Sequence, residues 1–304
     1  MSRTQAGDVS RRVGLIGLGL LGSALAERLL AAGFDVIGFD LDPPRRESFA
    51  RRGGQAAESV VEVADQSTRI FLSLPNSDVV AAVVDELLPA LPAGALLIDT
   101  TTGQPEAAAA RGRELASRGI GYLDATVAGS SEQTRRGEVL VMVGAEPEHL
   151  EACRDLLATF SRKTLHLGPP GAGSRMKLVV NLALGLHRAV LAEALSLAQA
   201  LGFEAGQALE TLRASPACSA AMETKGEKMI AGDFTPQARL AQHLKDVELI
   251  LQASRDGGSW TPFSELHRDV LQSLVDQGHG DLDNSAILKA FESRGGRGPN
   301  PSER

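Results

Sequence analysis

Cysteine is scarce in this chain of 304 residues. The two that occur, Cys153 and Cys218, lie in different halves with no motif around either. Two isolated cysteines exclude a disulfide framework and a zinc site built on cysteine ligands. We expect both side chains to be small core residues, and we expect a reducing, cytoplasmic location for the protein.

A concentration of basic charge is also missing. The formal net charge is −7, and no basic block offsets it. The nearest candidates are scattered arginine pairs, such as Arg45-Arg46 and Arg135-Arg136, which are typical of a solvated surface. This balance argues against a nucleic-acid partner.

Two further absences limit the function. No uninterrupted apolar run approaches the ~20 residues that span a bilayer, and residues 1–10 lack the pattern of a signal peptide. We therefore expect no membrane partner. We predict no metal site, because the six histidines are scattered: His149, His166, His187, His243, His267 and His279.

The first half of the chain alternates short apolar runs with amphipathic stretches. Such alternation indicates a parallel sheet covered by helices on both faces. The apolar runs predict strands at residues 13–16, 36–39, 70–74, 95–98, 121–125, 139–143 and 164–167. Helical spacing is clearest at residues 24–32, 79–88 and 105–118.

The second half is almost free of strand signals. Residues 174–201 are rich in Ala and Leu, contain no proline, and predict one long helix of about 28 residues. Further helices are predicted at residues 205–214, 217–230, 238–255, 263–277 and 285–292. The predicted fold is an α/β domain with a Rossmann-type doubly wound sheet (11–168), then an all-α domain for substrate binding and dimerisation (169–293), with disordered tails at 1–10 and 294–304.

A glycine-rich turn, Gly17-Leu18-Gly19-Leu20-Leu21-Gly22, follows the first predicted strand and precedes a predicted helix. A G-x-G-x-x-G pattern alone is weak, but this strand–turn–helix context is that of a dinucleotide-binding fingerprint. Gly17 would permit the tight turn, Gly19 would let backbone approach the pyrophosphate, and Gly22 would allow close helix packing. The phosphates would then face the amides at the helix N-terminus.

Asp40 ends the second predicted strand, 18 residues beyond Gly22. A carboxylate there can accept hydrogen bonds from the adenosine ribose and would repel a 2′-phosphate. The next residue is Leu41, where NADP sites often have arginine. The sequence therefore favours NAD as cofactor, while Arg45 and Arg46 keep NADP as the less favoured alternative.

The chain also resembles the β-hydroxyacid dehydrogenases, which include 3-hydroxyisobutyrate dehydrogenase and tartronate semialdehyde reductase. The resemblance extends from Val13 to about Phe291. It rests on the order and spacing of motifs at residues 17–22, 74–75, 99–102, 124–131, 171–177, 192–194, 245–246 and 280–286. It implies an NAD(P)-dependent oxidoreductase that acts on CH–OH groups, here of a small β-hydroxy acid or its semialdehyde.

Lys177 matches the catalytic acid/base of that family, and Asn181 matches the asparagine that helps hold the substrate. The two are one helical turn apart, so they share a helix face. A general base must be partly neutral at the working pH, and we expect burial and the helix N-terminus to lower the pKa of Lys177 towards neutrality. The alternative is a lysine that merely extends to solvent from the start of a helix.

By the same resemblance, the residues that contact the cofactor are Leu74, Pro75, Thr101, Thr102 and Lys245, and the turn of Thr101 and Thr102 contacts its nicotinamide side. The substrate segment departs from the family pattern. It reads Asp-Ala-Thr-Val-Ala-Gly-Ser-Ser over residues 124–131, and Ala128 replaces the serine that usually anchors the substrate carboxylate. The resemblance still implies that residues 128–130 (Ala128, Gly129 and Ser130) bind the substrate, but it leaves the substrate's identity open.

Two alternatives remain at this point. Imine reductases resemble this architecture but usually lack a lysine at the position of Lys177. A non-catalytic dinucleotide-binding module on the same scaffold would also be expected to lack that lysine. We predict a small carboxylate or aldehyde substrate and a homodimer or homotetramer, because a long apolar helix favours burial between domains or subunits.

Overall fold

The structure is a computed structural model that describes residues 11–295. Most of the two predicted tails therefore lies outside the described residues. The chain divides into two compact units, residues 1–177 and 178–304. The division falls within the long helix α9 (Ala172–Ala200).

The first unit is built on one eight-stranded sheet with the order β3-β2-β1-β4-β5-β6-β7-β8. The chain runs outward from β1 in one direction and then returns to begin again at β4. This order contains the switch point between β1 and β4 at which doubly wound folds bind ligands. The strands are β1 (Arg12–Ile16), β2 (Asp35–Phe39), β3 (Gln55–Ala56), β4 (Arg69–Leu72), β5 (Leu96–Asp99), β6 (Gly121–Ala128), β7 (Val139–Gly144) and β8 (Ser161–Gly168).

One strand pair differs from the parallel sheet that the sequence indicated. β7 runs antiparallel to β6, whereas the neighbouring pairs β5–β6 and β7–β8 are parallel. Only ten residues connect β6 to β7, and they contain the short helix α6 (Ser131–Arg136). A parallel crossover needs a dozen residues or more, so this connection reverses the strand direction.

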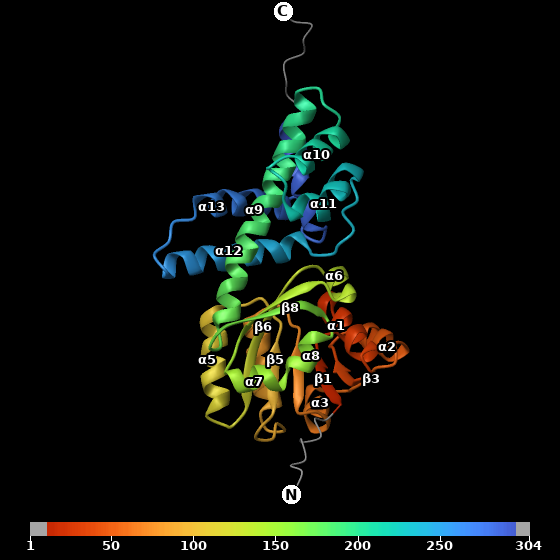
Figure 1. The fold of residues 1–304 in the computed structure, drawn as a ribbon, viewed down its shortest axis with the longest axis vertical. Coiled ribbons are helices and arrows are strands. Elements are labelled where there is room, and N and C mark those ends of the chain that lie inside the picture. Colours follow the sequence, from red (N-terminus) through yellow and green to blue (C-terminus); the bar gives the residue numbers. More distant parts are fainter. Residues whose placement is uncertain (1–10, 296–304) are drawn as a thin grey trace, which may run out of the picture. The chain divides into compact units, whose positions relative to one another are not determined.

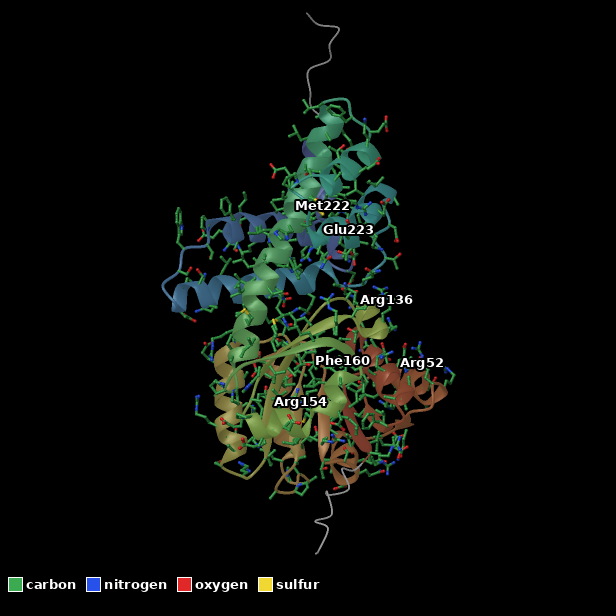
Figure 2. All side chains as sticks on the ribbon, in the orientation of Figure 1. Arg52, Arg136, Arg154, Phe160, Met222 and Glu223 are labelled. Atoms are coloured by element: carbon green, nitrogen blue, oxygen red, sulfur yellow. The ribbon has the colours of Figure 1, made fainter. Side chains whose placement is uncertain are left out.

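Helices cover both faces of the sheet, as Figure 1 shows for α1 and α5. Alternate strand residues supply two separate cores: Val13 and Leu15 belong to one, and Ile16 belongs to the other. Phe160, labelled in Figure 2, is fully buried and packs edge-on against Phe71 of β4. The helices are α1 (Leu20–Ala31), α2 (Pro43–Arg51), α3 (Val60–Gln66), α4 (Ser77–Leu87), α5 (Pro105–Ala116), α6, α7 (Pro147–Ala152) and α8 (Arg154–Ala158).

The elements that the sequence did not reveal are short. β3 has two residues, and its partner residues in β2 are Ile37 and Gly38. α2 and α3 have nine and seven residues, and α2 carries one buried residue, Phe49. A periodicity needs several buried positions to be recognised, and these elements offer few.

The second unit is all helical in its described part, as predicted. After α9 it contains α10 (Ala205–Ala214), α11 (Ala220–Ala231), α12 (Leu240–Asp256), α13 (Pro262–Asp276), the 3₁₀ helix η1 (Asn284–Leu288) and α14 (Lys289–Gly295). Figure 1 shows α12 and α13 side by side. On α11, Met222 enters the core of this unit while its neighbour Glu223 is exposed (Figure 2), as expected of an amphipathic helix.

The segment from Gly280 to Ala286, part of the family resemblance, has a structural function in this unit. Asp283 is fully buried and accepts hydrogen bonds from Lys225 Nζ and from the amides of Gln237, Ala238 and Ser285. These contacts hold together α11, the segment before α12, and η1. A buried carboxylate with this many donors replaces its lost hydration with protein contacts.

Helix α9 is long and apolar enough to span a membrane by length and composition, with a mean hydropathy of 1.5 over its best 18-residue window. The helix contains no long uninterrupted apolar run, because Arg188 and Glu193 interrupt it. Its mean hydropathy stays high because the apolar residues around these two charges outweigh them. This is weak evidence for a membrane span, since the core helix of a soluble protein passes the same test.

Candidate functional site

The glycine-rich turn joins β1 to α1 at the switch point of the sheet. Gly17 has φ = +94°, and an added Cβ would lie 2.2 Å from the Ser73 carbonyl oxygen. A Cβ on Gly22 would lie 1.9 Å from the Gly17 carbonyl oxygen. Gly19 differs, because its Cβ would meet only one atom within 4 Å, on the side chain of Arg45. The protein therefore needs Gly17 and Gly22 for its own packing, whereas Gly19 leaves an open face that fits an approaching pyrophosphate.

Asp40 contacts this turn directly. Its Oδ2 accepts a hydrogen bond of 2.7 Å from the Leu18 amide, and its Oδ1 accepts one from the Asp42 amide. The Arg45 guanidinium lies 3.3 Å from Oδ2, and Arg46 donates to the Asp40 carbonyl oxygen. The carboxylate is buried but keeps acceptor capacity, since an ionised carboxylate has about four lone-pair sites. Leu20 and Leu21 begin α1, so the turn, the first helix and Asp40 form one continuous group.

The loops after β4 and β5 are joined to each other. The Leu74 amide donates to Thr101 Oγ1 at 3.1 Å, and the amide and hydroxyl of Thr100 both donate to the Leu72 carbonyl oxygen. These loops follow the carboxyl ends of adjacent parallel strands, the edge at which open α/β folds bind ligands. Pro75 is exposed and Thr102 is half-buried in the same two loops.

Lys177 lies in the second turn of α9, and only 8% of its surface is exposed. Its Nζ donates a hydrogen bond of 2.6 Å to the carbonyl oxygen of Val127, immediately before Ala128. The ammonium is therefore held beside the predicted substrate segment and does not extend to solvent. The reading of Lys177 as a surface lysine is excluded by its burial.

The start of α9 is fixed to β6 by Asp124, which the sequence had shown only as part of a motif. Its carboxylate accepts hydrogen bonds from the Gly171 amide at 2.7 Å and the Ser174 amide at 2.6 Å. Burial raises the pKa of Asp124 to about 6, although these hydrogen bonds oppose the shift. Gly173 also approaches closely, since its Cβ would lie 2.6 Å from the Asp124 carbonyl oxygen. β6 thus positions both the helix that carries Lys177 and the loop that follows Ala128.

The loop after β6 uses its own polar groups in a capping box. Ser130 Oγ accepts from the Gln133 amide, and the Ser130 amide donates to Gln133 Oε1 at 2.9 Å. The Ser130 amide is therefore already engaged, while Gly129 opens the loop with φ = +152°. Sequence reasoning did not identify Gln133, although the Ser-x-x-Gln spacing of a capping box was visible.

The remaining predicted residues lie in the second unit. Asn181 is buried, and its Nδ2 donates to Asp246 Oδ2 at 2.9 Å. Lys245 Nζ lies 3.5 Å from the other carboxylate oxygen of Asp246. Asp246 thus contacts two predicted site residues, Asn181 and Lys245. The sequence pointed to Asp246 only through its position next to Lys245.

Comparison with known proteins adds the family. Residues 12–168 match the model described as the NAD binding domain of 6-phosphogluconate dehydrogenase. Residues 171–291 match the model described as NAD-binding of NADP-dependent 3-hydroxyisobutyrate dehydrogenase. Together the two models cover nearly all of the described chain.

Relatives of similar length agree with these models. The chain is 34% identical to 2-(hydroxymethyl)glutarate dehydrogenase of Eubacterium barkeri, over 95% of this chain and 97% of the relative. It is 31% identical to L-threonate dehydrogenase of Cupriavidus necator, over 93% and 97%. The crystal structure of 3-hydroxyisobutyrate dehydrogenase from Salmonella typhimurium is 25% identical, with a TM-score of 0.85 and coverage of 91% and 99%.

An imine reductase from Pseudomonas sp. shares the fold at 21% identity with a TM-score of 0.60, and so does not favour that alternative. The matched family models, the full-length relatives and the doubly wound sheet with its glycine turn all agree. The chain belongs to the 3-hydroxyisobutyrate dehydrogenase-like β-hydroxyacid dehydrogenases, NAD(P)-dependent oxidoreductases that act on the CH–OH group.

Proposed function

We propose that this protein is an NAD-dependent dehydrogenase or reductase of a small β-hydroxy acid or its semialdehyde, with Lys177 as the general acid/base. The observation that carries the proposal is the buried Lys177 amine, 2.6 Å from the carbonyl oxygen of Val127 at the start of the substrate segment. The amine is thereby held where it can exchange a proton with the hydroxyl of a substrate bound at that segment.

In the oxidation direction, the neutral Lys177 amine accepts the proton of the substrate hydroxyl, and bound NAD supplies the hydride acceptor. In the reduction direction, the protonated amine gives its proton to the forming alkoxide. The Val127 carbonyl accepts a hydrogen bond from Nζ and so limits where that nitrogen can move. Asp124 holds the first turn of the helix and thereby keeps Nζ in reach of the substrate.

NAD is the proposed cofactor, with NADP less favoured. The support is the Asp40 carboxylate, which is held beside the glycine turn by the Leu18 amide. A 2′-phosphate would meet this negative charge. Arg45 lies within 3.3 Å of the same carboxylate and is the residue through which NADP could still be accommodated.

The substrate class follows from the loop after β6 and from the relatives. Two relatives are named as dehydrogenases of 2-(hydroxymethyl)glutarate and L-threonate, both hydroxy acids. Ala128 has no hydroxyl to offer the carboxylate, and the Ser130 amide serves the capping box. We therefore assign carboxylate binding to the Gly129 amide together with the hydroxyls of Ser130 and Ser131.

We also propose that the protein forms a homo-oligomer. Within the second unit, α9 exposes Val179, Val190 and Leu197 on one side, each about 60% exposed. Trp260, Phe263 and Leu266, around the start of α13, are exposed as well. A row of exposed apolar side chains along one side of a helix, as on α9, is typical of a surface that associates.

The test is a Lys177→Ala variant, assayed with small 3-hydroxy acids and the matching semialdehydes and with both cofactors. We expect turnover to fall by about 10²–10⁴-fold, the contribution of a positioned acid/base, while NADH binding remains. Lys163→Ala removes an exposed lysine of β8 and serves as the matched control. A Lys177→Ala enzyme with near-normal rates would rule out the mechanism.

A further inference from the structure

The single tyrosine of the chain, Tyr122, lies on β6 with 2% of its surface exposed. Its hydroxyl donates a hydrogen bond of 2.7 Å to Asp99 Oδ2, at the carboxyl end of β5. Burial and the nearby carboxylate raise the pKa of Tyr122 well above its usual value, so the phenol keeps its proton. Tyr122 is thus a permanent donor to a buried carboxylate.

Asp99 also forms a hydrogen bond with the loop that follows it. Its Oδ1 accepts a hydrogen bond of 2.9 Å from the Thr101 amide, which closes a tight local turn. Thr101 Oγ1 in turn accepts from the Leu74 amide. A series of hydrogen bonds therefore leads from the tyrosine hydroxyl to the Thr101 loop, proposed to contact the nicotinamide side of the cofactor, and to the Leu74 loop beside it.

A cavity of about 120 Å³ lies beside this series of contacts. Its lining includes Asp99, Thr101, Tyr122, Ser77, Gln104 and Arg111. A water molecule occupies about 30 Å³ in the liquid, so the cavity has room for several next to polar partners. Removing only the tyrosine hydroxyl would leave Asp99 accessible to such water, and we expect the fold to survive the change.

We propose that Tyr122 is a positioning residue for the nicotinamide half of the cofactor, acting through Asp99 on Thr101 and Leu74. The proposal rests on the proposed dehydrogenase function. Neither Tyr122 nor Asp99 touches the cofactor in this role. The pair sets the backbone and hydroxyl of Thr101 so that the loop is ordered before the cofactor arrives, and it has no effect on the adenosine half at the glycine turn.

The test is a Tyr122→Phe variant, with binding measured for NADH and NADPH by nicotinamide fluorescence and for ADP by calorimetry. ADP carries the adenosine half and lacks the nicotinamide. We expect the Kd of the preferred reduced cofactor to rise by about three- to tenfold, while the Kd of ADP stays within twofold of wild type. The fluorescence of the bound nicotinamide should also change, since its surroundings are less ordered.

Two controls separate positioning from general damage. Ser67→Ala removes another buried hydroxyl, which donates to the Val63 carbonyl oxygen. Ser67 precedes β4, whereas Leu74 follows the opposite end of that strand, so the substitution should leave both affinities unchanged. Asp99→Asn weakens the link itself. If Tyr122 acts through Asp99, adding Tyr122→Phe to Asp99→Asn should weaken cofactor binding little further.

The possible outcomes are distinct. Equal losses of NADH and ADP affinity, an unchanged NADH affinity, or full additivity of the two substitutions would each overturn the positioning role. A wild-type protein that binds ADP but neither reduced cofactor would instead refute the dehydrogenase function, and the positioning role with it. Melting temperatures of all variants establish that folded proteins are being compared.

Discussion

At the scale of single residues, Asp40 has two functions within a few ångströms. It holds the Leu18 amide in the glycine turn and pairs with the Arg45 guanidinium, and in our proposal it presents negative charge to the adenosine ribose. Under the proposed NAD preference, the balance between the carboxylate and the guanidinium sets which dinucleotide fits, so a change at Asp40 should alter cofactor choice more than cofactor binding as a whole.

An Asp40→Asn substitution keeps an oxygen that can accept from Leu18 but removes the charge. We expect the Kd of NADH to rise by about tenfold, that of NADPH to fall, and the preference between them to change by more than tenfold. Fluorescence titration of both cofactors measures this. Asp42→Asn serves as the control. It removes the same charge from a carboxylate that pairs with Arg45 Nε, and it should change the cofactor preference less. A wild-type protein that already prefers NADPH would show instead that Arg45 and Arg46 control the pocket.

Residues of the site differed in how far the sequence could reveal them. Gly17, Asp40 and Lys177 stand in local patterns whose spacing carries their chemistry. Tyr122 and Asp124 act through partners that are distant in sequence, 23 residues from Tyr122 to Asp99 and 47 from Asp124 to Gly171. No local periodicity encodes such pairs, so they became visible only when the sheet brought the strands together.

At the scale of elements, several buried hydrogen bonds constrain the junction between β6 and α9. Asp124 accepts two amides from the start of α9, and Thr126 Oγ1 donates to the Gly173 carbonyl oxygen. Because burial raises the folded-state pKa of Asp124 to about 6, the folded protein binds a proton there more readily than the unfolded chain, whose carboxyl titrates near 3.9. Asp124 therefore costs stability above pH 6, and this cost disappears as the pH falls through 6 towards 4.

This junction yields a prediction about the pH dependence of stability. As the pH falls from 7 to 4.5, the unfolding free energy of the wild type should gain about 1–3 kcal/mol relative to that of Asp124→Asn, which cannot titrate. Urea unfolding of both proteins at several pH values measures the difference. A relative loss at acid pH would mean that the carboxylate is stabilised by its two amides more than it is penalised by burial.

Elements were predictable where buried apolar residues formed a continuous run or a helical period. The long α9, the strands of the inner sheet and the helices α12 and α13 appeared in the sequence within a few residues of their observed bounds. β3 and α6 did not, since a two-residue strand and a six-residue helix have too few positions for a period. The antiparallel direction of β7 was not predicted either. It depends on the short connection between β6 and β7, in which the sequence did not reveal the helix α6.

At the scale of the whole molecule, the charge and the exposed apolar residues bear on assembly. The second unit exposes Val190 and Leu197 on α9 and Trp260 near the start of α13. Exposing such side chains to water is unfavourable, and covering them with a second copy would stabilise both. The net charge of −7 is modest and would oppose association only weakly.

We therefore expect a native mass of at least twice 31.9 kDa in size-exclusion chromatography with light scattering. Val190→Lys should shift the population towards the monomer, since a charge in an apolar interface loses its hydration. Arg154→Glu alters an exposed position of α8 in the other unit and should leave the mass unchanged. A wild-type protein with the mass of one chain at micromolar concentration would contradict the oligomer.

The doubly wound sheet and the helical second half were both predictable, because periodic apolar patterns report buried faces directly. The preference for NAD or NADP and the identity of the substrate were less predictable. They depend on a few charged groups and hydroxyls whose partners lie elsewhere in the chain.

One pair of neighbouring residues in the sheet links the two transfers of the proposed reaction, that of the hydride and that of the proton. Asp99 and Asp124 are register partners on β5 and β6. The first governs the loop proposed to hold the nicotinamide, which receives the hydride, and the second governs the helix whose lysine receives the proton. If the proposed function holds, the distance between the hydride acceptor and the proton acceptor is set by the hydrogen-bonded pairing of β5 with β6, and not by either loop alone. Variation at the outer loops could then alter the substrate while the two transfers stay aligned.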